Sequence, residues 1–167
     1  MEAYNKNMKK LIFLFFVLKL ILPGNTVFSQ ENQTDGFYPP NAILNAAYMG
    51  DAELLQQILL TNPDKDVRDS LGGTALHVAV LQNNLEVIKL LLDNGFDVNA
   101  VIPPEGYPLL RGYTPLHYCV WTNNASAAGL LLQYQANKNI KAADNMTPVE
   151  KATKEGKRDL LILFARY

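Results

Sequence analysis

Apolar residues recur every three or four positions along much of the chain, which is the spacing of an amphipathic helix. The clearest case is TALHVAVLQNNLEVIKLLLD, residues 74–93, where two short helical patterns follow each other. The first pattern places Leu76, Ala79 and Val80 on one face. The second predicts a helix from Glu86 to Asp93 whose buried stripe is Val87, Ile88, Leu90 and Leu91. The chain is therefore predicted to be all-α and built from pairs of short helices.

A four-letter phrase that begins the first of these helices recurs downstream. It reads TALH from Thr74, TPLH from Thr114 and TPVE from Thr147, with spacings of 40 and 33 residues. Stepping 33 residues back from Thr74 reaches Asn41, where NAILNAAYMGDAELLQQILL keeps the pattern without the opening threonine. The sequence thus predicts four helix-turn-helix repeats with one enlarged connection. The approximate repeats are 39–68, 69–101, 107–141 and 142–167, and the insertion is 101–113.

The residues around each phrase suit the ends of short helices. The hydroxyl of Thr74, Thr114 or Thr147 can accept an N–H of the first turn. Gly95 follows the second helix and favours the left-handed conformation that ends many helices. The third repeat has Gln135 in that place, and a side chain there disfavours the same conformation.

A period of 33 residues with the phrase T-P-L-H-x-A is the signature of ankyrin repeats, and residues 69–100 match it nearly throughout. Residues 39–167 therefore resemble an ankyrin-repeat domain. The resemblance implies a solenoid of helix pairs with β-hairpin-like finger loops, and it implies binding of other proteins without chemistry. It also implies that His77 and His117 link neighbouring turns through hydrogen bonds. The residues that would maintain the repeat are Thr74, His77, Thr114, His117 and Thr147.

The resemblance further implies a binding face lined by loop tips and by one side of each first helix. In register, Tyr48, Leu81 and Trp121 form one row on that face, where a solvated surface would be polar. Tryptophan, tyrosine, methionine and arginine are enriched at protein interfaces, so Trp121 receives the most weight. The candidate partner-binding residues are Tyr48, Met49, Leu71, Leu81, Tyr107, Leu109, Leu110, Arg111, Tyr113, Trp121 and Met146.

The insertion reads VIPPEGYPLLRGY and holds three prolines, two leucines and two tyrosines. A disordered spacer would be more polar. One interpretation is a projecting finger that contacts a partner through Tyr107, Leu109 and Leu110. The other is a loop that folds back over Trp121 or the neighbouring repeat. Loops serve both purposes, and the sequence leaves both interpretations open.

The stretch TPLHYCVW, residues 114–121, holds one of the two histidines, the only cysteine and the only tryptophan. Cys119 aligns with Ala46, Ala79 and Ala152, which indicates a small buried position. No third ligand accompanies His117 and Cys119 at a spacing typical of zinc sites. We therefore predict no catalytic residue, no metal and no cofactor. An enzyme that uses His117 and Cys119 is the alternative from another class, and it requires an exposed thiol.

The start of the chain has the pattern of a secretory signal. Lys9 and Lys10 precede an apolar run of 12 positions, broken only by Lys19, and smaller residues lead to Ser29. A membrane-spanning helix needs about 20 residues, so we expect cleavage after Ser29, with an uncleaved anchor as the alternative. The predicted division is 1–29 signal peptide, 30–38 polar linker and 39–167 repeat domain.

Residues 30–167 carry eleven basic and fifteen acidic side chains, a net charge of −4, which disfavours nucleic acid as a partner. The charge is uneven. Residues 51–105 hold nine acids and three bases, whereas residues 138–167 hold four acids and seven bases. The single cysteine excludes an intramolecular disulfide, so packing must stabilise the fold.

These observations predict an exported, non-enzymatic module that binds another protein in the cell envelope, either periplasmic or secreted, with no membrane contact after signal removal. Two other roles use the same fold: an immunity protein that neutralises a toxin, and a secreted effector directed at host proteins. A structural protein that self-assembles through its apolar end, including Ile162 and Phe164, is a further alternative. The sequence leaves the partner and the oligomeric state open.

Overall fold

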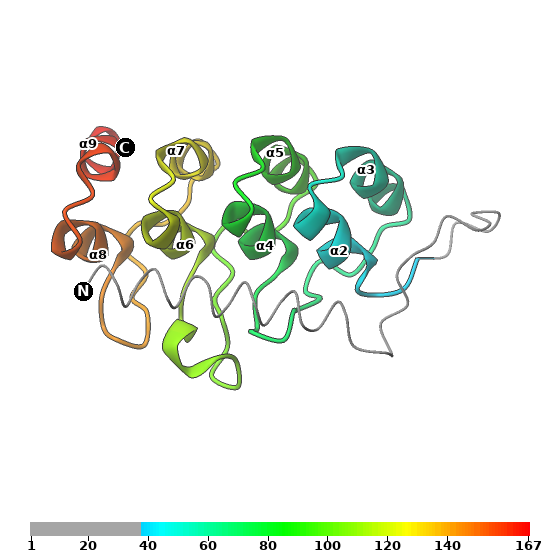
Figure 1. Cartoon of the computed structure of the whole chain (residues 1–167), viewed down its shortest axis with the longest axis horizontal. Coiled ribbons are helices and arrows are strands. Elements are labelled where there is room, and N and C mark those ends of the chain that lie inside the picture. The colour runs from blue at the N-terminus through cyan, green and yellow to red at the C-terminus, as the bar shows by residue number, and fades with distance from the viewer. Residues whose placement is uncertain (1–37) are drawn as a thin grey trace. The chain divides into compact units, whose positions relative to one another are not determined.

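The computed structural model describes residues 38–167, in which eight α-helices form two rows (Figure 1). The first row contains the first helix of each pair, and the second row contains the second. The first row is α2 (Ala42–Met49), α4 (Ala75–Leu81), α6 (Pro115–Thr122) and α8 (Pro148–Lys154). The second row is α3 (Ala52–Leu60), α5 (Leu85–Asp93), α7 (Ala125–Gln133) and α9 (Arg158–Arg166).

Each helix packs against the other member of its pair and against the next helix of its own row. The expected all-α stack of helix pairs is confirmed for this part of the chain. The predicted signal peptide, 1–29, lies outside the described residues. Gly36–Tyr167 form one compact unit, and the described residues 38–167 contain its buried core.

The loops between pairs differ from the expected β-hairpin-like fingers, because residues 38–167 contain no β-strand. Two backbone bonds close each of these loops. The N–H of Asp69 donates to the carbonyl of Gly73 at 2.9 Å, and that of Ala142 donates to Met146 at 3.0 Å. A turn bond inside each loop, from Gly72 to Asp69 and from Asn145 to Ala142, completes the closure without extending into a strand ladder.

Small side chains allow the first-row helices to lie close to their neighbours. Ala46, Ala79, Cys119 and Ala152 occupy the same position in the four repeats, and all are fully buried. Cys119 therefore fills a slot that alanine fills elsewhere, as the alignment predicts. A residue of larger volume there would force the helices apart.

The buried stripe of α5 differs by one residue from the predicted one. Val87, Ile88, Leu91 and Leu92 are buried, whereas Leu90 is only half-buried. At about 100° per residue, the four buried positions span an arc of about 140°, and Leu90 lies outside it. The sequence pattern admitted either leucine, and packing against α4 and the neighbouring second-row helices selects Leu92.

The ends of the second-row helices show where the repeats bear strain. Gly95 follows α5 with φ of 75°, and Gln135 follows α7 in the same place with φ of 63°. A left-handed residue with a Cβ costs roughly 1–2 kcal/mol relative to glycine. The third repeat therefore contains a conformational penalty that the second repeat avoids.

We predict that Gln135→Gly raises the free energy of unfolding by up to about 1 kcal/mol, because the relief of strain exceeds the entropy that glycine adds to the unfolded chain. The reciprocal change Gly95→Gln should lower it by about 1–2 kcal/mol. Urea titration of both variants measures the difference. If both variants change the free energy of unfolding equally and with the same sign, Gln135 does not bear the left-handed strain that Gly95 avoids.

Candidate partner-binding surface

The insertion between α5 and α6 is closed at its base. The N–H of Ile102 donates to the carbonyl of Tyr113 at 3.0 Å, and the N–H of Gly112 donates to the carbonyl of Ile102 at 2.8 Å. A single turn of 3-10 helix, η1 (Pro108–Leu110), forms its tip (Figure 1). The loop thus has a fixed internal conformation.

Backbone bonds also tie the insertion to the loops on both sides. The N–H of Tyr107 donates to the carbonyl of Leu71 at 3.0 Å, and the N–H of Ala143 donates to the carbonyl of Arg111 at 2.9 Å. The guanidinium of Arg68 adds a third link, because it donates to the carbonyls of Gly72 and Val101 at 2.9 and 3.0 Å. The insertion therefore bridges the loops before and after it.

Burial divides the insertion into an anchored side and a presented side. Ile102 and Leu110 are buried, and Leu71 of the neighbouring loop is buried with them. Tyr107 is 36% exposed and Leu109 is 54% exposed. The two interpretations of the sequence each describe part of this loop: it folds onto the preceding loop, and it also presents apolar side chains to solvent.

Trp121 does not lie on an open surface, which corrects the expectation that gave it most weight. It is only 6% exposed, and its ring packs edge-on against Tyr118 with 5.5 Å between the ring centres. Tyr118 is buried and also contacts the ring of His77 edge-on at 5.1 Å. The tryptophan thus belongs to an aromatic cluster at the junction of the second and third repeats.

Leu71 and Leu110 require the same correction, because both are buried where an exposed contact residue was expected. The remaining candidates differ in accessibility. Those with exposed side chains are Met49, Tyr107, Leu109 and Arg111. Those that are half-buried are Tyr48, Leu81, Tyr113 and Met146. Three of the four exposed candidates lie in the insertion.

The imidazole of His77 joins two repeats. Its Nδ1 lies 3.2 Å from the backbone nitrogen of Thr74, and its Nε2 lies 3.2 Å from the carbonyl oxygen of Tyr113. A carbonyl only accepts, so Nε2 donates and Nδ1 is left to accept from Thr74. The ring is therefore neutral in a defined tautomer, and it ties the start of α4 to the base of the insertion.

His117 repeats this arrangement one junction later. Its Nδ1 lies 3.1 Å from the backbone nitrogen of Thr114, and its Nε2 lies 3.2 Å from the carbonyl oxygen of Met146. The linking role expected for the two histidines is thereby confirmed. Burial, the largest influence, lowers the pKa of His77 to about 3 and that of His117 to about 4.

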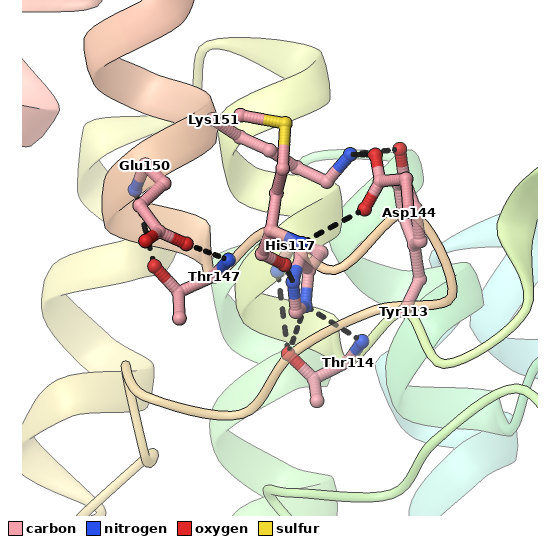
Figure 2. A network of polar contacts seen from close by, with 8 residues as sticks. Tyr113, Thr114, His117, Asp144, Thr147, Glu150 and Lys151 are labelled. Atoms are coloured by element: carbon pink, nitrogen blue, oxygen red, sulfur yellow. Dashed lines mark hydrogen bonds and ion pairs between the residues drawn. The ribbon is translucent and has the colours of Figure 1, made fainter.

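A polar cluster that the sequence analysis missed lies beside His117 (Figure 2). The buried ammonium of Lys151 donates to the hydroxyl of Tyr113 at 2.8 Å and to the carboxylate of Asp144. It also lies 4.5 Å from the centre of the Tyr113 ring. Burial alone would lower the pKa of Lys151, but its bonds to Asp144 and Tyr113 outweigh burial and raise it.

A comparison of equivalent positions in the repeats already indicates this cluster. Val78 and Tyr118 fill the position of Lys151 in the two preceding repeats, and both are buried. A lysine at a position that is otherwise buried requires a partner. The partners come from loops, whose side-chain positions the helical pattern does not specify.

The structure places His117 and Cys119 away from any reactive arrangement. Cys119 is fully buried, and burial raises the pKa of its thiol, so the thiolate that a nucleophile requires is disfavoured. Within residues 38–167, no group of three or more His, Cys, Asp or Glu side chains could hold a metal ion.

None of the helices of this part is long and apolar enough to cross a membrane.

We predict that the repeat unit loses stability as the pH falls from 7.5 to 5. Both histidines have a folded-state pKa far below the unfolded value of 6.5, so the unfolded chain binds more protons in this range. Their contribution is fully present above pH 6.5 and is lost progressively toward the folded-state values. The loss at pH 5 should be about 2 kcal/mol for each histidine.

Urea titrations at pH 7.5, 6 and 5 measure this dependence. The carboxylates with lowered pKa titrate below this range, so a His77→Gln, His117→Gln variant should give a flatter profile. A wild-type stability that stays constant or increases toward pH 5 would contradict the buried neutral histidines.

Comparison with known proteins gives a consistent result. A family model described as ankyrin repeats in three copies matches residues 7–102 and 43–142, which together cover most of the chain. Human ankyrin repeat and SOCS box protein 3 is 27% identical over 169 aligned residues, covering 83% of this chain and 32% of the human protein.

Two further relatives come from a bacterium and a mammal. A putative ankyrin repeat protein of Rickettsia felis is 31% identical over 145 residues, covering 84% of this chain and 45% of that protein. The mouse B-cell lymphoma 3 protein homolog is 33% identical over 103 residues, covering 62% of this chain and 22% of the mouse protein. The chain spans less than half the length of each of these relatives.

Proposed function

The chain belongs to the ankyrin repeat family, and on this premise we propose that it is a non-enzymatic module that binds a partner protein mainly through its insertion. Ankyrin repeats generally mediate protein–protein interaction. The support for this location is that three of the four exposed candidates lie on the insertion, whereas Trp121, Leu71 and Leu110 are buried.

One observation carries this proposal: the insertion is both fixed and apolar at its surface. Its backbone bonds to Leu71 and Ala143 hold it between two loops, while Tyr107 and Leu109 remain exposed. A loop that is already ordered loses less conformational entropy on binding, so its apolar contacts contribute more to affinity. A tyrosine and a leucine on such a loop suit a pocket in a partner.

The proposed location is the cell envelope, either the periplasm or outside the cell. The support is the sequence pattern of Lys9 and Lys10, the apolar run after them, and the small residues up to Ser29. Asp51, Asn84 and Asn124 cap α3, α5 and α7, and the core holds together by packing without a disulfide. Such a fold does not depend on the redox state of its compartment.

Capture of partners from an extract of the source cells tests the proposal. Immobilised protein should retain a specific partner, and a Tyr107→Ser, Leu109→Ser variant should lose it, because both side chains are exposed and neither supports the core. Glu105→Ser is the control, since Glu105 is exposed on the same insertion but presents no apolar surface.

Purified partner and titration calorimetry then give the affinities, with thermal melts to verify that each variant is folded. A loss of at least about tenfold for the double serine variant corresponds to the removal of a hot spot. Equal retention by wild type and the double variant would overturn the proposed role of the insertion.

A further inference from the structure

The end of the insertion that leads into α6 lies against the last repeat. We call this end, residues 111–113, the C-terminal limb. The N–H of Ala143 donates to the carbonyl of Arg111 at 2.9 Å. A Cβ added to Gly112 would lie only 3.0 Å from the Cα of Ala142, a distance that few Cβ atoms show. The limb therefore meets the loop before α8 backbone to backbone, and the missing side chain of Gly112 makes room for this contact.

The side chain of Tyr113 extends this contact to α8. Its hydroxyl accepts from the ammonium of Lys151 at 2.8 Å, and the same ammonium pairs with Asp144 (Figure 2). The bonds that Tyr113 accepts from His77 and from Ile102 reach only its carbonyl. The position of the phenol hydroxyl therefore depends on α8 and on the loop before it.

Two features favour local opening of the last helix pair. The pair ends the stack, so it packs against one neighbouring pair, through α6 and α7. Its second helix also begins without a side-chain cap. Asp51, Asn84 and Asn124 cap α3, α5 and α7. At the equivalent position α9 has Lys157, whose side chain makes no such bond and whose charge is unfavourable at a helix N-terminus. Elements with few contacts and weak ends are the first to open in a folded protein.

We propose that the last helix pair controls the order of the insertion, with Lys151 as the positioning residue. While α8 is folded, its lysine and the loop before it hold the C-terminal limb. When the pair opens locally, Arg111 and the hydroxyl of Tyr113 lose the groups that bind them. The limb then keeps only its bonds within the insertion and to the second repeat.

The consequence for a partner rests on the proposed function of the insertion. An insertion that has lost part of its order must regain it on binding, so opening of the last pair weakens the contacts of Tyr107 and Leu109 with a partner. The coupling is reciprocal. A partner that binds the ordered insertion stabilises α8 and α9, and any ligand that stabilises these helices strengthens binding of the partner. The last repeat thereby regulates the binding site without contact with the partner.

Residue-resolved amide exchange of the whole chain tests this control without a partner. Lys157→Asn gives α9 the cap that α5 and α7 have, so the amides of α9 should exchange about fivefold more slowly. The amides of Gly112 and Ala143 should slow by a similar factor, although neither residue lies on α9. Asp51→Ala removes the cap of α3 at the other end of the row. It is the matched control and should leave both amides unchanged.

Lys151→Met tests the positioning contact itself. Methionine fills the buried position without the charge, and Asp144, whose side chain is 47% exposed, stays hydrated. The amides of Gly112 and Ala143 should then exchange at least about fivefold faster, while the amides of α9 stay protected. Tyr113→Phe, which removes only the hydroxyl, should give the same change.

Two results would overturn the proposal. One is slower exchange of α9 in the capped variant with no change in the two amides of the limb and its partner loop. The other is unchanged exchange of these two amides in both variants of the positioning contact, which decides the matter even where the new cap fails to slow α9. Because exchange requires no partner, a failure of the serine double variant to lose its partner would contradict only the proposed function.

Discussion

The order of the stack depends on buried imidazole rings that bond in two directions. Each ring accepts an N–H at the start of its own helix and donates to a carbonyl of the next loop. This requires a neutral ring held in one tautomer. Burial keeps the ring neutral by lowering the pKa of each histidine, and the carbonyl that accepts from Nε2 fixes the tautomer. One side chain thus completes a helix cap and fixes the position of the following repeat.

The last repeat uses different chemistry at the same position. Glu150 replaces the histidine, and its carboxylate accepts the N–H of Thr147 at 2.8 Å, so it caps its own helix. Lys151, whose ammonium joins Tyr113 and Asp144, adds a link to the preceding repeat beside the one that His117 makes to Met146. Tyr113 is therefore a shared residue: its carbonyl accepts from His77 and its ring stacks beside His117 at 5.1 Å.

Much of this fold was predictable from the sequence because its determinants are local. The helix pairs, the threonine caps, the left-handed Gly95 and the small slot of Cys119 all follow from residues within one repeat or its aligned positions. The surface was less predictable. Alignment of the repeats gives the direction of Trp121 on its helix, but it does not show that the ring packs against Tyr118 and is covered. Lys151 was missed because its partners come from two different loops.

The insertion was predictable only in part. Its composition indicates an apolar loop, and the structure shows how that loop is held. The fixed loop is the central claim for function, and amide hydrogen exchange tests it most directly. The N–H groups of Tyr107, Gly112 and Ala143 each donate across the insertion or between loops. We expect all three to exchange only with opening of the neighbouring repeats, at rates far below those of an unstructured loop. Exchange of these amides at unprotected rates, with the helices still protected, would contradict a fixed conformation of the insertion.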